Sequence, residues 1–163
     1  MRAPLHYLPL YPEHLFKLRV HPVQTDEYNA LLTDAALNNM ATCTGVSGWA
    51  GERCIGIAGV YPLWDQRAEA FVLFAEDAKH YILQALPKIR YVLDAIPFRR
   101  VEMNVKAHNY KGHQLARHLG FGGRQKVELA NGDVVQAEGY MEKFWPGNGE
   151  GVDVVMYARI KPS

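Results

Sequence analysis

The stretch NYKGHQLARHLGF, from Asn109 to Phe121, carries the signals of one complete helix. Asn109 is a residue type that caps helix N-termini, because its side-chain oxygen accepts a backbone N–H bond. Gly120 supplies the left-handed residue that ends many helices, and three apolar residues share one face of the predicted helix: Leu115, Ala116 and Leu119. The stretch therefore predicts a capped amphipathic helix. Whether this helix only packs in the core or also forms one wall of a ligand site is the question that the rest of the sequence has to answer.

The composition indicates one domain with a sizeable core. The chain has 163 residues, of which 48% are hydrophobic and 11% aromatic. No apolar run approaches the roughly 20 residues that cross a membrane, and the first residues lack the continuous apolar region of a secretory signal. We expect a single domain over residues 1–163, located in the cytoplasm and without a membrane partner.

Two cysteines, Cys43 and Cys54, are too few for a disulfide framework. If the segments around them pair as a hairpin, Cys54 should lie opposite Ser47 rather than Cys43. We therefore expect reduced, packed thiols. No Cys/His grouping has the spacing of a zinc site, so we also expect no metal.

The formal net charge of +1 conceals an uneven distribution of charge. Residues 76–126 contain ten Lys/Arg, four Asp/Glu and four of the seven histidines, so this stretch carries +6 and the remainder −5. A basic surface suits a polyphosphate ligand, although a solvated basic surface without a ligand is equally compatible with the count. We expect no nucleic-acid partner, because no nucleic-acid motif accompanies the charges.

The predicted elements alternate in a way that favours a mixed sheet with helices on its faces. The hydrophobic periodicity predicts strands at 6–11, 41–49, 53–61, 67–74, 99–107, 138–146 and 153–160, and helical segments at 13–20, 25–40, 78–96 and 109–121. The last two strands are expected to pair across the link GNGEG, residues 147–151. Asp77 is a plausible N-cap for the helix over 78–96, and Pro87 predicts either a kink or a helix start near that residue.

Two predicted strands carry polar residues that need an explanation. Glu69 lies on the buried-looking strand RAEAFVLF. In RRVEMNVKA, the alternation points the three apolar residues inward and Glu102, Asn104 and Lys106 to the other face.

This order of elements, together with the opening stretch, resembles the GNAT superfamily of N-acetyltransferases. The second motif of that family has Asn, a small residue three positions on, Leu at six, and Gly-Phe at eleven and twelve. Asn109, Gly112, Leu115, Gly120 and Phe121 occupy these positions. The resemblance implies an α/β (α+β) fold with a mixed, mostly antiparallel sheet and helices on both faces. Within the superfamily, the runs from Glu69 to Phe121 look most like the short, divergent acetyltransferase-like proteins of tailed bacteriophages.

The resemblance implies that acetyl-CoA is the cosubstrate. In this family it lies in a V-shaped gap between the fourth and fifth strands, here 69–74 and 100–106. Splayed strands leave backbone groups that pantetheine amides can pair with, and a following helix N-terminus suits a pyrophosphate. The cofactor-binding residues that the resemblance implies are Phe74, Ala75, Lys79, His80, Asn109, Lys111, Gly112 and Arg117. The alternative is that Asn109 is only a cap and Lys111 only a solvated charge.

Two departures from the family pattern predict less efficient catalysis. The phosphate loop of the family is Gln/Arg-x-x-Gly-x-Gly/Ala, whereas the corresponding run here, AEDAKHYIL, has no glycine and contains Glu76 and Asp77. Ala116 stands where many members have the tyrosine that protonates the departing thiolate. We therefore expect weaker or differently seated CoA.

The candidate catalytic residues are Glu69, His113 and Tyr157. Several members of the family keep the general base at the position of Glu69, and neighbouring apolar side chains would raise its pKa. Glu102 is the second choice for the base. His113, Tyr110 and Tyr157 are the candidate proton donors in place of the missing tyrosine. The alternative for Glu69 is a solvent-exposed residue or a partner of an arginine.

The implied chemistry is direct attack of an amine on the thioester, without an enzyme nucleophile, since neither cysteine has an electropositive setting. A backbone N–H near Phe74 or Ala75 would polarise the carbonyl. The acceptor is an unknown amine on a small molecule or a protein. The competing hypothesis is a catalytically silent GNAT-fold protein that binds another protein, within a phage particle or against a host component. A homodimer through the last strand, 153–160, also stays open.

Overall fold

The computed structural model describes residues 3–145 and 151–162. The strands are β1 (Leu5–Pro9), β2 (Thr44–Ala50), β3 (Arg53–Trp64), β4 (Arg67–Phe74), β5 (Arg100–Lys106), β6 (Gln125–Glu128), β7 (Val134–Ala137), β8 (Gly139–Trp145) and β9 (Val152–Ile160). The helices are α1 (Thr25–Leu31), α2 (Asp34–Met40), α3 (Ile82–Ala95) and α4 (Tyr110–His118), with 3-10 turns at Pro12–Lys17, Pro22–Gln24 and Ala78–His80.

Seven of these strands form one mixed sheet in the order β1-β2-β3-β4-β5-β9-β8, and β6 pairs with β7 in a second sheet. The pairs β1–β2, β2–β3, β5–β9 and β8–β9 are antiparallel, whereas β4 and β5 run parallel. A parallel pair needs a crossover, and α3 supplies it. The predicted fold class, a mostly antiparallel mixed sheet with helices, is confirmed.

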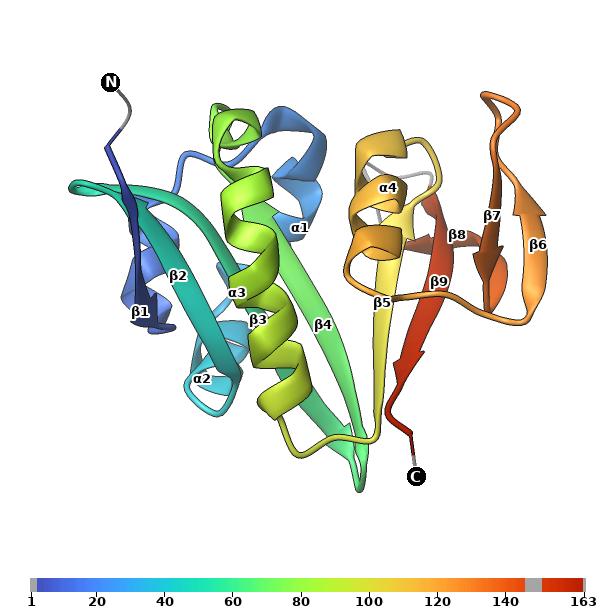
Figure 1. Cartoon of the computed structure of the whole chain (residues 1–163), viewed down its shortest axis with the longest axis horizontal. Helices are drawn as coiled ribbons and strands as arrows, with labels where there is room; N and C mark the ends of the chain where they lie inside the picture. Colours follow the sequence, from blue (N-terminus) through green and yellow to red (C-terminus); the bar gives the residue numbers. More distant parts are fainter. Residues whose placement is uncertain (1–2, 146–150, 163) are drawn as a thin grey trace. The chain divides into compact units, whose positions relative to one another are not determined.

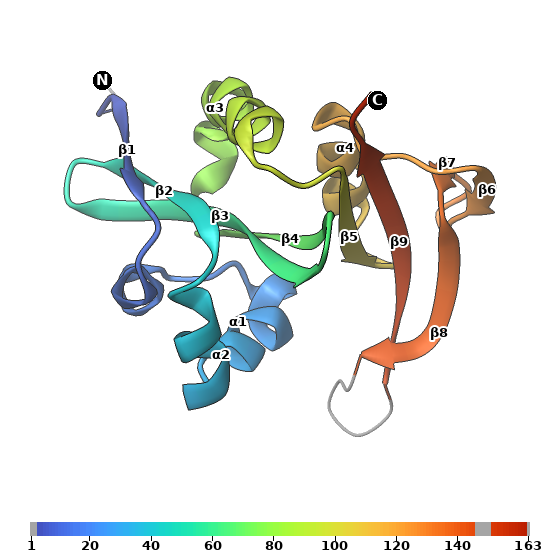
Figure 2. The same cartoon turned by 90° about the horizontal axis from the view of Figure 1, so that it is seen from below.

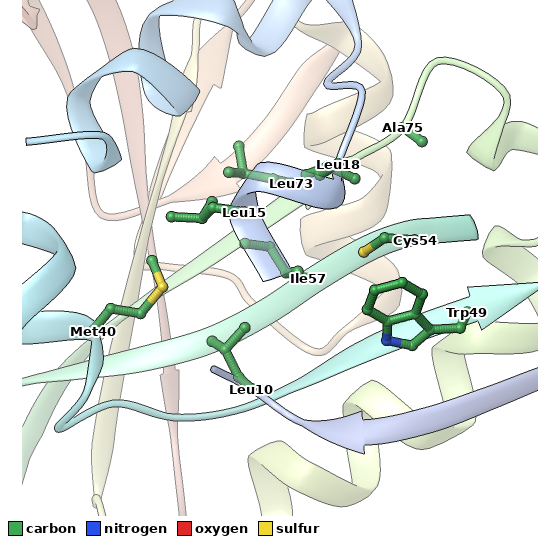
Figure 3. Packing of buried hydrophobic residues seen from close by; sticks show 9 residues of the cluster. All are labelled: Leu10, Leu15, Leu18, Met40, Trp49, Cys54, Ile57, Leu73 and Ala75. Atoms are coloured by element: carbon green, nitrogen blue, oxygen red, sulfur yellow. The ribbon is translucent and has the colours of Figure 1, made fainter. Parts of the chain in front are cut away.

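The chain divides into two compact units. The first comprises Met1–Leu63 with Ala70–Pro97, and the second comprises Trp64–Glu69 with Phe98–Ser163. In the first unit, α3 covers one face of the sheet and α1 and α2 cover the opposite face (Figure 2). The main core lies on the α1 and α2 side (Figure 3), and its buried residues are Leu10, Leu15, Leu18, Met40, Trp49, Cys54, Ile57, Leu73 and Ala75.

On the other face of the first unit, α3 packs against the sheet. A cavity of about 40 Å³ remains between them, with lining residues that include Gly48, Gly56 and Ala58 on the strands and Ala85 on the helix. Small side chains at these positions explain the gap, because they leave space that larger residues would fill.

The second unit contains β5, β9 and β8 together with α4 and the β6–β7 pair (Figure 1). His113 and Ala116 on α4 are buried, as are Leu119 and Phe121 directly after the helix. The first part of β4 belongs to this unit: Arg67, Ala68 and Glu69 pair with Arg100, Val101 and Glu102.

Three predictions about the first unit need correction. The predicted helix over 25–40 is two short helices, because the backbone leaves the helix at Leu32, and the segment 13–20 forms only a 3-10 turn. Cys54 lies opposite Trp49, while Ser47 pairs with Ile57. The predicted register was wrong by two residues because Ala50 pairs with Arg53, so the turn consists of Gly51 and Glu52 and lies one position later than the prediction assumed. Cys54 is buried and Cys43 is partly buried, and both are free thiols in the structure.

The start of α3 also differs from the prediction. The side chain of Asp77 makes no cap hydrogen bond and instead pairs with Arg53 at 2.6 Å. The helix begins at Ile82, after an irregular 3-10 turn, and Pro87 lies inside it. Because proline lacks an N–H, the helix loses one backbone bond at this position without ending.

In the second unit, the closing antiparallel pair was predicted correctly, but the hairpin β6–β7 was missed. Its signal is the Asn131-Gly132 dipeptide, which favours tight hairpin turns, and Gly132 has a φ of +89°. The last strand is not an edge, because β9 lies between β5 and β8. Residues 147–150 of the predicted link lie outside the described residues.

Candidate functional site

The helix that opened the sequence forms as predicted. The Oδ1 atom of Asn109 accepts a hydrogen bond from the Gly112 N–H at 3.0 Å, and Gly120 has a φ of +86°. Gly112 is required by packing, because a Cβ there would lie 2.7 Å from Asn109 Nδ2 and 2.9 Å from Val105 Cγ1. Asn109 and Gly112, two of the residues that carry the resemblance, therefore have a structural role in this chain: they allow α4 to pack closely against β5.

Glu69 lies on the part of β4 that pairs with β5, where its register partner is Glu102. Its Oε1 atom accepts a hydrogen bond from Asn104 Nδ2 at 3.1 Å. Burial raises the pKa of Glu69, the nearby Glu102 charge raises it further, and the Asn104 hydrogen bond opposes both effects. A carboxyl group with a raised pKa has the protonation behaviour that a general base needs near neutral pH.

The second choice for the base, Glu102, has the opposite environment. Arg67 and Arg100 both hydrogen-bond to its Oε1, Arg100 at 2.8 Å, and Arg100 also reaches Glu138 at 3.2 Å. Burial on its own would raise the pKa of Glu102, but the hydrogen bonds from Arg100 and Arg67 outweigh it and hold the pKa below its ordinary value. A carboxylate held by two guanidinium groups is a poor proton acceptor.

The other two candidate catalytic residues, His113 and Tyr157, lie in contact with each other. His113 is 3% exposed and Tyr157 is 1% exposed, and their Nδ1 and Oη atoms lie 2.7 Å apart. His113 Nε2 lies 3.0 Å from the Ala107 carbonyl, which only accepts. Because burial lowers the pKa of His113, the ring is neutral; Nε2 therefore carries the hydrogen and Tyr157 donates to Nδ1. Both polar groups are thus satisfied within the protein.

Glu69 and Tyr157 lie on opposite faces of the sheet in the second unit. Tyr157 is the register partner of Met103, while Glu69 bonds to Asn104, the next residue along β5. Successive side chains of a strand point to opposite faces. The structure therefore brings His113 and Tyr157 together but separates them from Glu69.

The predicted residues near the end of β4 lie in the first unit, and their backbone donors are already used. The Phe74 N–H donates to Gln24 Oε1 at 2.9 Å, and the Ala75 N–H donates to the Ile55 carbonyl at 2.8 Å. The Glu76 N–H donates to the Arg19 carbonyl at 3.2 Å. The N–H groups of Phe74 and Ala75 are the ones that the resemblance assigns to polarising a carbonyl.

The predicted basic residues of the cofactor site are exposed in both units. Lys79 and His80 belong to the first unit, and Lys111 and Arg117 to the second. The 3-10 turn Ala78–His80 lies where the resemblance implies a glycine-rich loop, and Tyr81 precedes α3 without a side-chain cap bond. Exposed basic side chains of this kind suit phosphate groups without fixing their position.

Two polar residues that the sequence interpretation gave no role, Asn104 and Gln24, each hydrogen-bond to a predicted site residue. Asn104 holds Glu69, and Gln24 holds Phe74. Asn104 was recognised as pointing away from the apolar face of its strand, but its partner depends on the parallel register of β4 and β5. Gln24 had no local signal, because the two residues that it bridges lie about fifty positions away.

Within residues 3–145 and 151–162, no group of three or more His, Cys, Asp or Glu residues is arranged to hold a metal ion. In the same part of the chain, every helix is too short or too polar to span a bilayer.

Solved structures that are similar to this chain include acetyltransferases. A ribosomal-protein-alanine N-acetyltransferase from Brucella melitensis has a TM-score of 0.66 and 14% identity, and the match covers 96% of this chain and 99% of that one. An acetyltransferase of the GNAT family from Streptococcus pneumoniae has a TM-score of 0.60 and 16% identity, with 97% and 100% covered. The chain has the GNAT acetyltransferase fold.

A third structure with this GNAT fold, RimL, a ribosomal L7/L12 alpha-N-protein acetyltransferase, was solved with coenzyme A. It has a TM-score of 0.67 and 14% identity, with 98% of each chain covered. No protein-family model matches the sequence, and neither does any curated protein. Identities this low show the shared fold alone, so the site has to be judged from the chain's own residues.

Proposed function

We propose that the chain is an acetyl-CoA-dependent N-acetyltransferase that moves an acetyl group to an amine of a small molecule or a protein. The observation that carries this proposal is Glu69, a half-buried carboxyl with a raised pKa on the fourth strand of a GNAT fold. The register partner of Glu69, Glu102, instead forms ion pairs with Arg67 and Arg100, which balance its negative charge. Two neighbouring carboxyl groups whose pKa values are pushed apart are typical of acid–base sites.

In the proposed reaction, ionised Glu69 accepts a proton from the acceptor ammonium group, directly or through water. The free amine then attacks the thioester carbonyl carbon and the C–N bond forms. The nitrogen loses its second proton to solvent, and the C–S bond breaks to release the CoA thiolate. Burial raises the pKa of both Cys43 and Cys54 to about 11, so each stays a thiol at neutral pH. This supports direct attack over an acyl-cysteine intermediate.

The proton that the CoA thiolate takes up is assigned to solvent in this proposal. The resemblance suggested His113, Tyr110 or Tyr157 as donors. The burial of His113 and Tyr157 and their mutual hydrogen bond favour a structural role, since a general acid has to reach the atom that it protonates.

For acetyl-CoA we retain the residues that the resemblance implies. Lys79, His80, Lys111 and Arg117 are exposed and basic, which suits phosphate groups. Asn109 and Gly112 would act through the start of α4, and Phe74 and Ala75 through their backbone. The last two require their present hydrogen bonds to be exchanged for bonds to the ligand.

The experiment that tests this function measures CoA thiol release from acetyl-CoA in the presence of a panel of primary amines. The wild-type protein is compared with Glu69→Gln and with Glu128→Gln, which makes the same change at an exposed position on β6. Amine-dependent release that is lost only in Glu69→Gln supports the proposal. Release that is equal in all three proteins removes Glu69 from the reaction.

A second candidate function is supported by the backbone N–H groups at the end of β4, which already donate hydrogen bonds within the protein. The N–H groups of Phe74, Ala75 and Glu76 all bond within the protein, and the segment 75–83 has no glycine. A GNAT-fold protein without catalysis, which binds a protein partner in a phage particle or in the host cytoplasm, fits these features. It predicts that the purified chain does not bind acetyl-CoA.

A further inference from the structure

Within the described residues, the nitrogen of the Asn104 amide has a hydrogen-bond partner, whereas the oxygen has none. Nδ2 donates to Glu69 Oε1 at 3.1 Å. Oδ1 is buried and lacks a hydrogen-bond partner within the described part of the chain. A buried acceptor without a donor costs free energy, so an unpaired oxygen beside a candidate base calls for a functional explanation.

The unpaired oxygen has a functional explanation, because the two protonation states of Glu69 need different hydrogen-bond partners. An ionised carboxylate only accepts, so it matches the Asn104 NH₂ group. A protonated carboxyl also carries an O–H donor, which needs an acceptor. Half a turn of the Asn104 amide about its Cβ–Cγ bond brings Oδ1 to the position of Nδ2, and the oxygen then accepts from the Glu69 hydroxyl.

We infer that Asn104 is the positioning residue of Glu69 and that its amide turns over when Glu69 takes up a proton. The same side chain then bonds to the Glu69 carboxyl before and after proton transfer, so the base keeps its position. The role of Asn104 in catalysis rests on the proposed function, whereas its hydrogen bond to Glu69 is a property of the chain alone.

The test is a pH titration of the Glu69 side-chain carboxyl by NMR, which requires no substrate. Because a hydrogen bond stabilises the ionised form more than the neutral form, Asn104→Leu should raise the pKa of Glu69 above its wild-type value. In the wild type, the Asn104 side-chain NH₂ signals should shift at the pH at which Glu69 titrates. Asn29→Leu makes the same change on the exposed surface of α1 and should leave the titration unchanged.

An unchanged Glu69 pKa in Asn104→Leu would overturn the inference. It would also be overturned if the Asn104 NH₂ signals of the wild type did not shift at the pH at which Glu69 titrates. If Asn104→Leu does not fold, Asn104→Ser keeps a donor with a shorter reach and should give a smaller rise in the pKa of Glu69.

If the pKa shift is found but no variant transfers acetyl groups, the proposed function fails while the pairing stands. If transfer is found, the acid limb of kcat/KM should move to higher pH in Asn104→Leu together with the NMR value.

A separate observation concerns the end of β4 in the first unit. The Gln24 carboxamide bridges two backbone groups of this strand: Nε2 donates to the Val72 carbonyl at 2.8 Å, and Oε1 accepts from the Phe74 N–H at 2.9 Å. Next to it, the His21 N–H donates to the Phe74 carbonyl at 2.8 Å, and Val20 forms an antiparallel bridge with Ala75.

These contacts close one edge of β4. The Ala75 N–H points to β3, where it bonds to Ile55, so the groups of Phe74 point to the opposite edge. A primary carboxamide offers the same donor and acceptor as a peptide group. Gln24 therefore takes the place that a neighbouring strand, or an extended ligand with amide groups, would occupy.

The geometry points to Gln24 as a latch that must withdraw before the amides of the pantetheine arm can pair with Val72 and Phe74. This rests on the proposed function. Gln24→Ala should bind acetyl-CoA several-fold more tightly than the wild type in calorimetry, and its Phe74 amide should exchange faster. Gln84→Ala, an exposed glutamine-to-alanine change on α3, serves as the control.

Equal, measurable affinities in the wild type and Gln24→Ala would overturn the latch alone. Absence of binding in both proteins would overturn the latch and the proposed function together. Tighter binding without faster exchange at Phe74 would also contradict the latch, because the gain would then not come from freeing that N–H.

Discussion

Glu69 and Glu102 are register partners on β4 and β5, yet the protein shifts their pKa values in opposite directions. Like charges directly opposite each other on neighbouring strands are unfavourable. The chain resolves this by giving Glu102 two arginines and Glu69 a single amide. The pKa of Glu102 is thereby lowered and that of Glu69 raised, and the raised pKa is the property that the proposed reaction requires of its base.

The two carboxyl groups should respond oppositely to neutralisation. A raised folded-state pKa means that the contribution of Glu69 to stability is fully present below its ordinary pKa of 4.5 and is lost as the pH rises through the folded value. Glu69→Gln should therefore raise the free energy of unfolding at pH 7, and this gain should disappear below pH 4.5. Urea denaturation at pH 4 and pH 7 measures the difference.

For Glu102 the sign is reversed, because its folded-state pKa is lowered. Its contribution is present above its ordinary pKa and is lost as the pH falls through the folded value. Glu102→Gln should lower the free energy of unfolding at pH 7 by about 1–3 kcal/mol, since Arg67 and Arg100 lose their charged partner. If both variants change stability in the same direction, the assignment of the two environments is wrong.

Activity should depend on Glu69 through its ionised form. Glu69→Gln should reduce acetyl transfer by about 10² to 10⁴ without weakening acetyl-CoA binding. In the wild type, kcat/KM should fall as the pH drops through the raised pKa of Glu69, and this acid limb should be missing in the variant. A variant with full activity and an unchanged pH profile would end the role of Glu69 as base.

The buried pair on the opposite face should matter for stability rather than for transfer. Tyr157→Phe removes the donor to His113 Nδ1 and leaves a buried acceptor unpaired, so unfolding should become easier by about 1–3 kcal/mol. The rate of acetyl transfer in the folded variant should stay within a few-fold of the wild type. A hundredfold slower reaction in a fully folded variant would restore Tyr157 as a proton donor.

Local signals made the fold partly predictable from the sequence. Asn109 and Gly120 define α4 because a cap and a left-handed glycine act within a few residues, and strand 67–74 was placed with the bounds that the structure has. The break at Leu32 was missed because the apolar face of 25–40 continues across it. The β6–β7 hairpin was overlooked even though Asn131-Gly132 is a strong local turn signal.

The site was less predictable because its contacts join distant parts of the sequence. Glu69 stood out as a carboxylate on an apolar strand, but Asn104 becomes its partner only through the parallel register of β4 with β5. The arginines on Glu102 and the bridge from Gln24 likewise depend on tertiary contacts. His113 and Tyr157 were grouped with Glu69 by analogy, and strand alternation places them on the other face.

The proposed contact of α4 with acetyl-CoA is best tested by a change of charge at Lys111 rather than by a substitution of Gly112. Any side chain at Gly112 would meet Asn109 and Val105, so a substitution there confuses folding with binding. Lys111→Glu should instead weaken acetyl-CoA binding about fivefold, as expected when one exposed attraction becomes a repulsion, and the effect should shrink at high salt. Lys126→Glu, exposed on β6, carries the same charge change as a control. Equal losses in both variants would indicate a general charge effect.

The central claim is that this GNAT fold still binds acetyl-CoA. Calorimetric titration of the purified protein with acetyl-CoA, with CoA and ATP as controls, tests it most directly at moderate salt. The account predicts saturable binding that is tighter for acetyl-CoA than for ATP, despite the glycine-free loop. No binding at millimolar ligand would contradict it and would leave the second candidate, a protein-binding role on an acetyltransferase fold.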